Sequence, residues 1–278
     1  MTLAAGILTT DGALLFSDSQ FANVEKENKP KIRSEAFEGL TVAFVMSGDE
    51  DYAITMMDDS FQAIRDTPPE QQSVRSAVKA ISNAIRPSME DYKKSGLDQT
   101  QKPEFVLAIS SPSRGPQLFA ISSTSIPSVD HFTFRGSGNY LAKYVMNAFS
   151  LPMKVPMRET VLAALYALTA AKRYDAFVGG GSQFLALRGM SAIGISYFNF
   201  QPEESQLIDE FERSCGSLLC SIVDTDIKAE ALQEKFKRFS SNMTDLHNRM
   251  TAPGTAYSTL IANLCQEISP RSSVKSQR

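Results

Sequence analysis

Blocks of apolar and polar residues alternate along the chain, and the first of them predicts a β-hairpin. Two apolar segments within the first eighteen residues are joined by Thr10-Asp11-Gly12, which has the composition of a tight turn. The second strand should return residues 17–21 alongside residues 2–6. We therefore expect Asp18 to lie within a few residues of Thr2.

The next blocks predict buried strands and amphipathic helices. An apolar run at residues 40–46 is typical of a buried strand. Apolar spacings of three and four then predict one helix ending near Arg65, capped by Ser47 or Asp49, and a second over Ser73–Lys94 that Pro87 kinks or stops. The later candidates are strands at Phe105–Ser110, Gln117–Ser122 and His131–Arg135, helices from Gly136 to about Phe149 and over Thr160–Arg173, and strands at Gln183–Arg188 and Ser191–Phe198.

The order of these elements favours an α+β fold. A doubly wound parallel sheet would alternate single strands with single helices, whereas here strands in groups alternate with helices in pairs. We predict a four-layer α/β/β/α sandwich over residues 1–200. Residues 201–269 predict a C-terminal helical extension, and the Ser/Arg/Lys-rich residues 270–278 predict a disordered tail. The helices expected in the extension are Glu203–Arg213, Lys228–Met250 and Tyr257–Ile268.

Composition narrows the functional classes. A net charge of −3 over 278 residues gives no sign of a nucleic-acid or anionic-membrane partner. The longest apolar run, residues 161–171, is too short to span a bilayer, and no secretory signal opens the chain. Three scattered cysteines fit reduced thiols, so a cytoplasmic location is expected. Only His131 and His247 are present, which argues against a Ser-His-Asp triad or a His-rich metal site; we expect no metal and no cofactor.

Candidate chemistry starts at Thr2. An initiator methionine before so small a residue is normally removed, which would leave Thr2 with a free α-amine. A hydroxyl and an amine on one residue form a nucleophile with its own base, because such an amine titrates at roughly 7.7–8.0. The alternative interpretation is a surface threonine that begins an ordinary hairpin.

A threonine after Met1, the pair Asp18-Ser19 and the pair Lys31-Ile32 together resemble the proteasome β-subunits and their bacterial ring-peptidase relatives, HslV and Anbu. The resemblance covers about residues 2–198 and implies an Ntn-hydrolase fold. It also implies a threonine peptidase in a self-compartmentalising homo-oligomeric ring that cleaves unfolded polypeptides or peptides, with an ATPase unfoldase as a candidate partner.

Two other functions stay open. An Ntn amidase acting on a small amide would use the same chemistry. A catalytically silent ring or scaffold subunit would resemble the proteasome α-type, but α-type subunits carry a helical extension before the first strand, and one residue precedes Thr2 here.

The resemblance assigns the central roles to three residues. Thr2 is the nucleophile, Lys31 is the buried lysine that lowers the pKa of the amine, and Asp18 is the salt-bridge partner of that lysine. The loop from Asp18 to Lys31 is shorter than in typical β-subunits, which makes Lys29 a competitor. A solvated loop lysine and a turn aspartate are the alternatives.

The resemblance also assigns supporting residues. Gly48 would supply an oxyanion-hole N–H, although Ser-Gly is a common turn pair. Ser137 would bond the terminal amine, although Gly-Ser-Gly before a helix can also bind phosphate. Asp175 would be the second acid. Val178 stands where β-subunits commonly carry a serine.

Three residues are expected to bind substrate. The resemblance places Glu50 in the pocket for the side chain that precedes the cleaved bond, with Ala22 and Met46 nearby. A carboxylate there would attract a substrate Lys or Arg. The alternative is that Asp49, Glu50 and Asp51 cap the helix in solvent.

Overall fold

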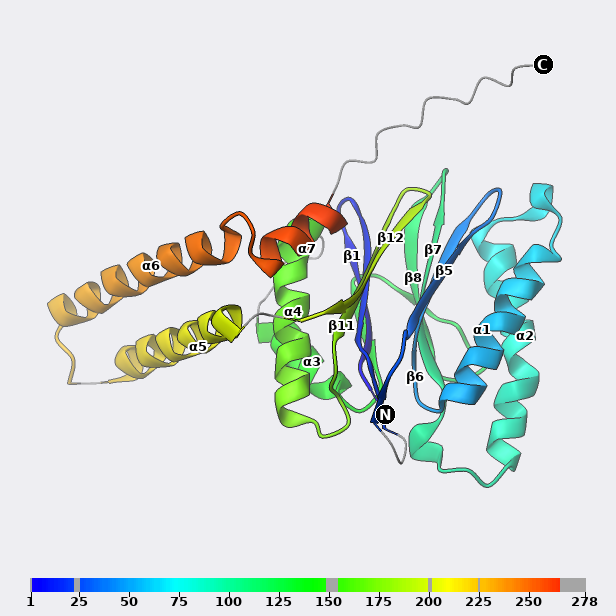
Figure 1. The fold of residues 1–278 in the computed structure, drawn as a ribbon, viewed down its shortest axis with the longest axis horizontal. Coiled ribbons are helices and arrows are strands. Elements are labelled where there is room, and N and C mark those ends of the chain that lie inside the picture. The colour runs from blue at the N-terminus through cyan, green and yellow to red at the C-terminus, as the bar shows by residue number, and fades with distance from the viewer. Residues whose placement is uncertain (1, 23–25, 149–154, 200–201, 225, 266–278) are drawn as a thin grey trace, which may run out of the picture. The chain divides into compact units, whose positions relative to one another are not determined.

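Two five-stranded sheets lie face to face between two pairs of helices, which confirms the four-layer sandwich (Figure 1). The structure is a computed structural model and describes residues 2–22, 26–148, 155–199, 202–224 and 226–265. Met1 and the predicted tail at 270–278 lie outside these residues.

The first sheet contains the predicted hairpin at its centre. Its strands lie in the order β10 (Phe132–Arg135), β1 (Ala4–Thr9), β2 (Gly12–Asp18), β11 (Ser182–Arg188) and β12 (Ser191–Phe198). Ala4 lies opposite Ser17, so residues 15–19, and not 17–21, return alongside residues 2–6. Gly12 sits in extended backbone, where a Cβ would lie 2.5 Å from the carbonyl oxygen of Leu187; the tight approach of β11 explains this glycine.

The second sheet contains three strands that the apolar pattern predicts and two that it does not. Its order is β5 (Ile32–Ala36), β6 (Thr41–Ser47), β7 (Glu104–Ser111), β8 (Gly115–Ile121) and β9 (Ser128–Val129), with the small pair β3 (Gln20–Ala22) and β4 (Lys26–Asn28) separate from it. Buried side chains of both sheets interdigitate between them, among them Leu15, Val45 and Leu185. This inner layer fixes the faces on which site residues lie.

Helices cover the outer face of each sheet. α1 (Glu50–Arg65) and α2 (Val74–Lys94) pack on the second sheet, and α3 (Asn139–Ala148) and α4 (Met157–Tyr174) pack on the first (Figure 1). Asp49 caps α1 by accepting the Tyr52 N–H at 3.2 Å. The predicted helix over Ser73–Lys94 is confirmed, since α2 runs to Lys94; of the two alternatives at Pro87, the stop is wrong. Proline at that position removes one donor, and the apolar face of α2, which includes Ile81, Ile85 and Met89, keeps the helix on the sheet.

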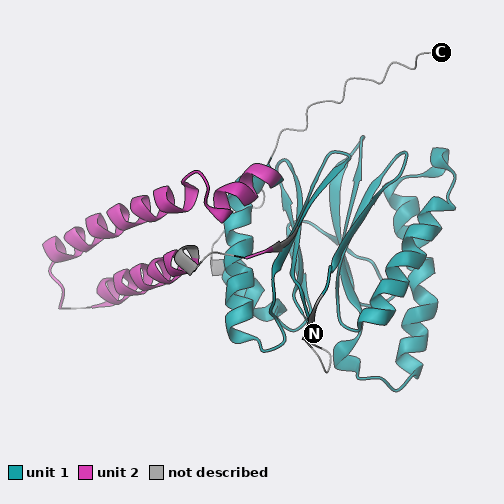
Figure 2. Ribbon diagram, viewed as in Figure 1, with its two compact units in different colours: residues 1–197, 264–278 teal, residues 198–263 magenta. Residues whose placement is uncertain are grey.

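Residues 198–263 form a compact unit of their own (Figure 2). Within it α5 (Pro202–Val223) packs on α6 (Ala229–Thr251), and α7 (Ala256–Leu264) follows. The predicted end of α5 at Arg213 is wrong, because the helix runs on through Gly216 to Val223. None of the described helices has both the length and the apolar character needed to cross a membrane.

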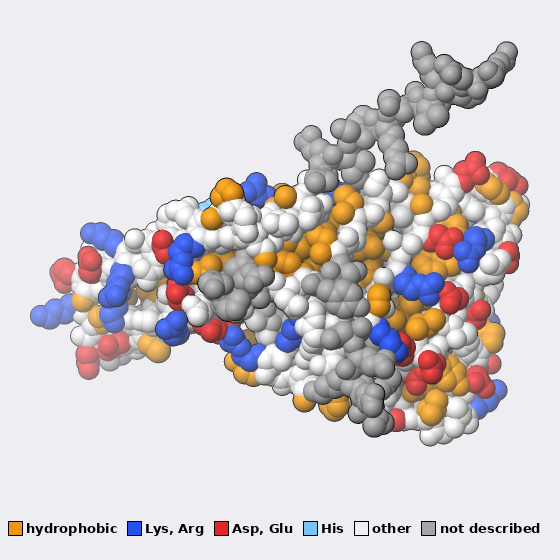
Figure 3. All heavy atoms as spheres, in the orientation of Figure 1, with side chains coloured by type: hydrophobic (Ala, Val, Ile, Leu, Met, Phe, Trp, Pro, Cys, Tyr) orange, Lys and Arg blue, Asp and Glu red, His pale blue; other side chains and the backbone are white. Residues whose placement is uncertain are grey.

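Surface charges of both signs are interspersed on the face seen in Figure 3. Two ion pairs join β5 to α1: Arg33 to Asp58 at 2.6 Å, and Arg65 to Glu35 at 2.9 Å. Exposed pairs such as these contribute at most about 1 kcal/mol each.

Candidate active site

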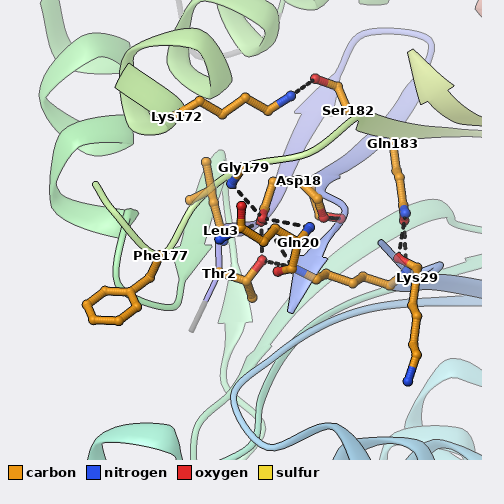
Figure 4. A network of polar contacts seen from close by, with 12 residues as sticks. Thr2, Leu3, Asp18, Gln20, Lys29, Lys172, Phe177, Gly179, Ser182 and Gln183 are labelled. Carbon is orange, nitrogen blue, oxygen red and sulfur yellow. Dashed lines mark hydrogen bonds and ion pairs between the residues drawn. The ribbon is translucent and has the colours of Figure 1, made fainter. Parts of the chain in front are cut away.

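Thr2 is a buried residue whose hydroxyl takes part in two hydrogen bonds. Only 1% of its surface is exposed, so the surface-threonine interpretation is wrong. Its hydroxyl donates to Oδ1 of Asp18 (Figure 4), and the oxygen of the Thr2 hydroxyl accepts a hydrogen bond from Nζ of Lys31. The structure therefore brings together the three residues to which the resemblance assigned the central roles.

The Asp18 carboxylate is the point on which several segments converge. It is fully buried at the end of β2 and receives hydrogen bonds on both oxygens (Figure 4). Oδ1 accepts from the Thr2 hydroxyl and the Leu3 N–H (2.9 Å), and Oδ2 accepts from the N–H groups of Gln20 (3.2 Å) and Gly179 (3.1 Å) and from Lys31 Nζ (3.2 Å). A buried carboxylate needs such partners to stay ionised, and here it orients the Thr2 hydroxyl as well.

Lys31, and not Lys29, reaches the Thr2 hydroxyl. The Lys31 side chain is fully buried, and Nζ also donates to the carbonyl of Gln20. Gln183 fixes this segment, because its amide accepts the Lys31 N–H and donates to the Lys29 carbonyl, each at 2.8 Å. Burial lowers the pKa of Lys31 from its usual 10.5 to about 8, although Asp18 and, more weakly, Glu50 act to raise it. Lys31 can thus exchange a proton near neutral pH.

The predicted Gly136-Ser137 turn packs directly on Thr2. Gly136 has φ +88°, and the Oγ of Ser137 is buried without a hydrogen-bond partner among the described residues. Glu104 anchors the turn by accepting the Gly136 N–H at 3.2 Å. A role of the Ser137 hydroxyl in binding the terminal amine stays a prediction.

The close contact of Gly136 with Thr2 predicts that a side chain at this position is not tolerated. A Cβ there would lie 1.9 Å from the Thr2 carbonyl oxygen, in a left-handed backbone that L-residues avoid. We expect Gly136→Ala to displace Thr2, lower the stability by more than about 1 kcal/mol and abolish hydrolysis. Gly115→Ala is the matched control, since its φ is +65° but nothing lies within 4 Å. Urea unfolding and peptide hydrolysis measure the two effects; equal losses in both variants would contradict the packing argument.

Gly48 occupies the predicted junction between β6 and α1. Its φ is +94°, and a Cβ would lie 2.3 Å from the Lys102 carbonyl oxygen. The backbone of residues 101–102 therefore suffices to require glycine here, and an oxyanion role stays a prediction.

Asp175 lies at the C-terminal end of α4 and does not join the groups seen at the Thr2 hydroxyl in the described chain. Its carboxylate accepts the Phe177 N–H at 2.8 Å in a local turn. Val178 is buried, with Cγ2 only 3.0 Å from where a Gly138 Cβ would stand, so it packs the start of α3 in place of a polar contact.

The expected substrate residues differ in environment. The Glu50 side chain is 10% exposed and pairs with Nζ of Lys29 at 3.0 Å, so Asp49 alone provides the cap and Glu50 does not extend into solvent. Met46 is buried in the core between the second sheet and α1–α2. Ala22 ends β3 opposite Lys26.

Sequence reasoning missed several polar residues around the site. Gln20 and Gln183 hold the Lys31 segment, and Lys172 donates to the Ser182 hydroxyl at 2.8 Å (Figure 4). Only the register of β2 against β11, which sets Asp18 opposite Ser182, could have revealed the last pair. Within the described residues, no group of three His, Cys, Asp or Glu side chains is placed to hold a metal ion.

The fold matches solved structures of Anbu proteins. One is an Anbu mutant from Hyphomicrobium sp. strain MC1, with a TM-score of 0.70, 11% identity, and coverage of 82% of this chain and 100% of that one. Another, described as an ancestral β-subunit, comes from Yersinia bercovieri, with a TM-score of 0.65, 14% identity, and coverage of 82% and 99%. A third is a helical assembly of the Anbu complex from Pseudomonas aeruginosa, with a TM-score of 0.60, 15% identity, and coverage of 92% and 99%.

No protein-family model and no curated protein sequence matches this chain. The structural likeness, at such low identities, shows the fold alone: the α/β/β/α sandwich that this chain shares with the Anbu proteins.

Proposed function

We propose that this protein is a threonine-type peptidase that hydrolyses peptide bonds with Thr2 as its nucleophile. The observation that carries the proposal is the Thr2 hydroxyl between two fully buried charged groups, Asp18 and Lys31. A buried ion pair is costly to maintain and commonly adds little stability, so a functional reason for it is needed.

The geometry supports a two-step acyl transfer. Once Met1 is removed, Thr2 Oγ attacks the substrate carbonyl carbon and its proton passes to the α-amine, which Ser137 would orient. The oxyanion forms facing the Gly48 N–H, and collapse expels the leaving amine, which takes up the proton. Water then hydrolyses the Thr2 ester and releases the acid. Lys31 lowers the pKa of the amine, and Asp18 holds both Thr2 and Lys31 in place.

Removal of Met1 tests this mechanism most directly. We expect the intact mass to lack Met1 and a β-lactone or epoxyketone probe to add one equivalent at Thr2, located by peptide mapping. Full-length protein that retains Met1 and still hydrolyses peptides would contradict an N-terminal base.

We further propose that the protein assembles with copies of itself into a ring in the cytoplasm, where enclosure limits access to unfolded chains. The support is the fold shared with Anbu proteins, one of which is described as a helical assembly. An ATPase unfoldase would then be a suitable partner for folded substrates. Sedimentation at micromolar concentration tests the assembly, and a purely monomeric protein would contradict it.

Glu50 sets an expected cleavage preference. Its carboxylate is mostly buried, lies near enough to Lys31 to act on its charge, and is already paired with the half-exposed Lys29. A substrate Arg would compete with Lys29 for this carboxylate, whereas a substrate Glu would be repelled. We expect fluorogenic peptides ending in Arg to be cleaved about tenfold faster than those ending in Glu.

Two variants separate the contributions of this pair. Glu50→Ala should remove the preference for Arg, and Lys29→Ala should strengthen it by leaving the carboxylate unpaired. Preference for Leu in wild type and both variants would show that the Lys29–Glu50 pair has only a structural role at the start of α1 and does not contact substrate.

A further inference from the structure

A second lysine, partly buried, is bonded to the strand next to Asp18. Lys172 stands in the last turn of α4 and donates to the Ser182 hydroxyl at 2.8 Å (Figure 4). Ser182 is buried at the start of β11, directly opposite Asp18 in the adjacent strand. No carboxylate in the described part of the chain lies within ion-pair distance of Lys172 Nζ.

The segment that Lys172 anchors encloses Asp18. Between α4 and β11, the Gly179 N–H donates to Asp18 Oδ2 at 3.1 Å, and the carbonyls of Gly179 and Gly181 accept from Gln20 N–H (3.1 Å) and Ser19 N–H (2.8 Å). The bond from Lys172 to Ser182 ties the two ends of this segment together. The same contact thus fixes the segment and positions a positive charge near Asp18.

We propose that Lys172 is a positioning residue of the Thr2 site: it holds residues 175–182 against Asp18 and maintains a second positive charge on that side of the Asp18–Lys31 pair. This inference rests on the proposed function, because it specifies how the same site is tuned. Lys172 acts through Asp18 and Lys31 and has no contact with the reacting atoms.

The charges around the pair support this role. Burial lowers the pKa of Lys172 to about 8; Asp18 acts to raise it, and Lys31 lowers it further. Lys172 and Lys31 are thus two cations that repel each other on either side of the same acid. Asp18 pairs directly with Lys31, and the further positive charge of Lys172 also favours a neutral α-amine on Thr2.

The pH profile of peptide hydrolysis tests the tuning. In Lys172→Met, the lower limb of kcat/KM against pH should move up by roughly half a unit, because one cation near the base is lost. Lys172→Arg keeps the charge and should restore the wild-type limb. Ser182→Ala keeps the charge but loses the anchor, so it should lower kcat/KM with the limb unmoved. Lys79→Met, an exposed lysine on α2, controls for net charge. A slower Lys172→Met enzyme with an unmoved limb would overturn the proposal and leave Lys172 a purely structural anchor.

A second measurement does not depend on hydrolysis. A lysine whose pKa is lower in the folded than in the unfolded protein makes folding more favourable as pH rises from about 8 to 10.5. We expect this rise in the free energy of unfolding with pH, measured with urea, to be smaller in Lys172→Met and in Lys31→Met than in wild type. In the double variant the two losses should not add, because each lysine is repelled by the other in wild type. Additive losses would overturn the coupling. If wild type cleaves no peptide, the proposed function fails, and the unfolding cycle still decides the coupling.

Discussion

Thr2→Ala should lose hydrolysis by at least about a thousandfold, since it removes the attacking oxygen. The same change should lower the stability by about 1–3 kcal/mol, because the hydroxyl is a buried partner of both Asp18 and Lys31 and not a free group. Steady-state peptide hydrolysis and urea unfolding measure the two effects. The site geometry thus couples catalysis and stability at a residue next to the start of the chain.

Two variants distinguish a nucleophile from a mere structural hydroxyl. Thr2→Ser keeps the oxygen and should retain activity and probe labelling. Thr10→Ala, in the exposed turn of the hairpin, should change neither property. Hydrolysis that survives in Thr2→Ala would contradict the threonine-peptidase proposal and place the activity at another site.

Lys31→Met should abolish hydrolysis and cost about 3–5 kcal/mol in the free energy of unfolding. The reason is that Asp18 would be left as a buried carboxylate without its cation, although it keeps N–H donors from Leu3, Gln20 and Gly179.

The pH dependence of stability gives a second test of the same variant. The folded pKa of Lys31 is about 8, below the usual 10.5, so folded wild type binds fewer protons than unfolded wild type between these values, and its stability rises with pH there. Lys31→Met should show a smaller rise.

The control variants use the neighbouring lysine and the partner acid. Lys29→Met should remain active and lose under 1 kcal/mol, since Lys29 is 43% exposed. Lys31→Met with Asp18→Asn removes both charges and should regain part of the lost stability without regaining activity. An inactive Lys29→Met beside an active Lys31→Met would reverse the assignment of the two lysines.

Local pattern predicts elements with a strong apolar period. β1, β2, β6 and β7 are fully or almost fully buried, and α1 and α2 bury one face each, so both kinds were visible in the sequence. β5 was not, because Ile32–Ala36 is a half-exposed edge strand whose partner on β6 decides its conformation. α5 was cut short for a related reason: Gly216 weakens the local helix signal, yet the packing of α5 on α6 carries the helix past it.

The site shows the same division between local and long-range information. The predicted hairpin brought Thr2 and Asp18 together, and the resemblance assigned Lys31 and Ser137. Lys172 falls in the last turn of α4, where cations are common, and only strand register places its partner Ser182 opposite Asp18. Asp175 matched by spacing, but a hydrogen bond to Phe177 keeps it in its own turn. Spacing along the chain does not determine the direction of a side chain.

The partners of Asp18 include Gly179, 161 residues further along the chain, and Lys31 is held by Gln183 at a separation of 152. A nascent chain that has not yet emerged as far as β11 therefore has its nucleophile but no assembled site. Contacts of such long range form late, after loop closure over most of the sequence. On the proposed function, the hydrolytic centre is thus absent until the sandwich is complete, and an unfinished copy is not yet a protease.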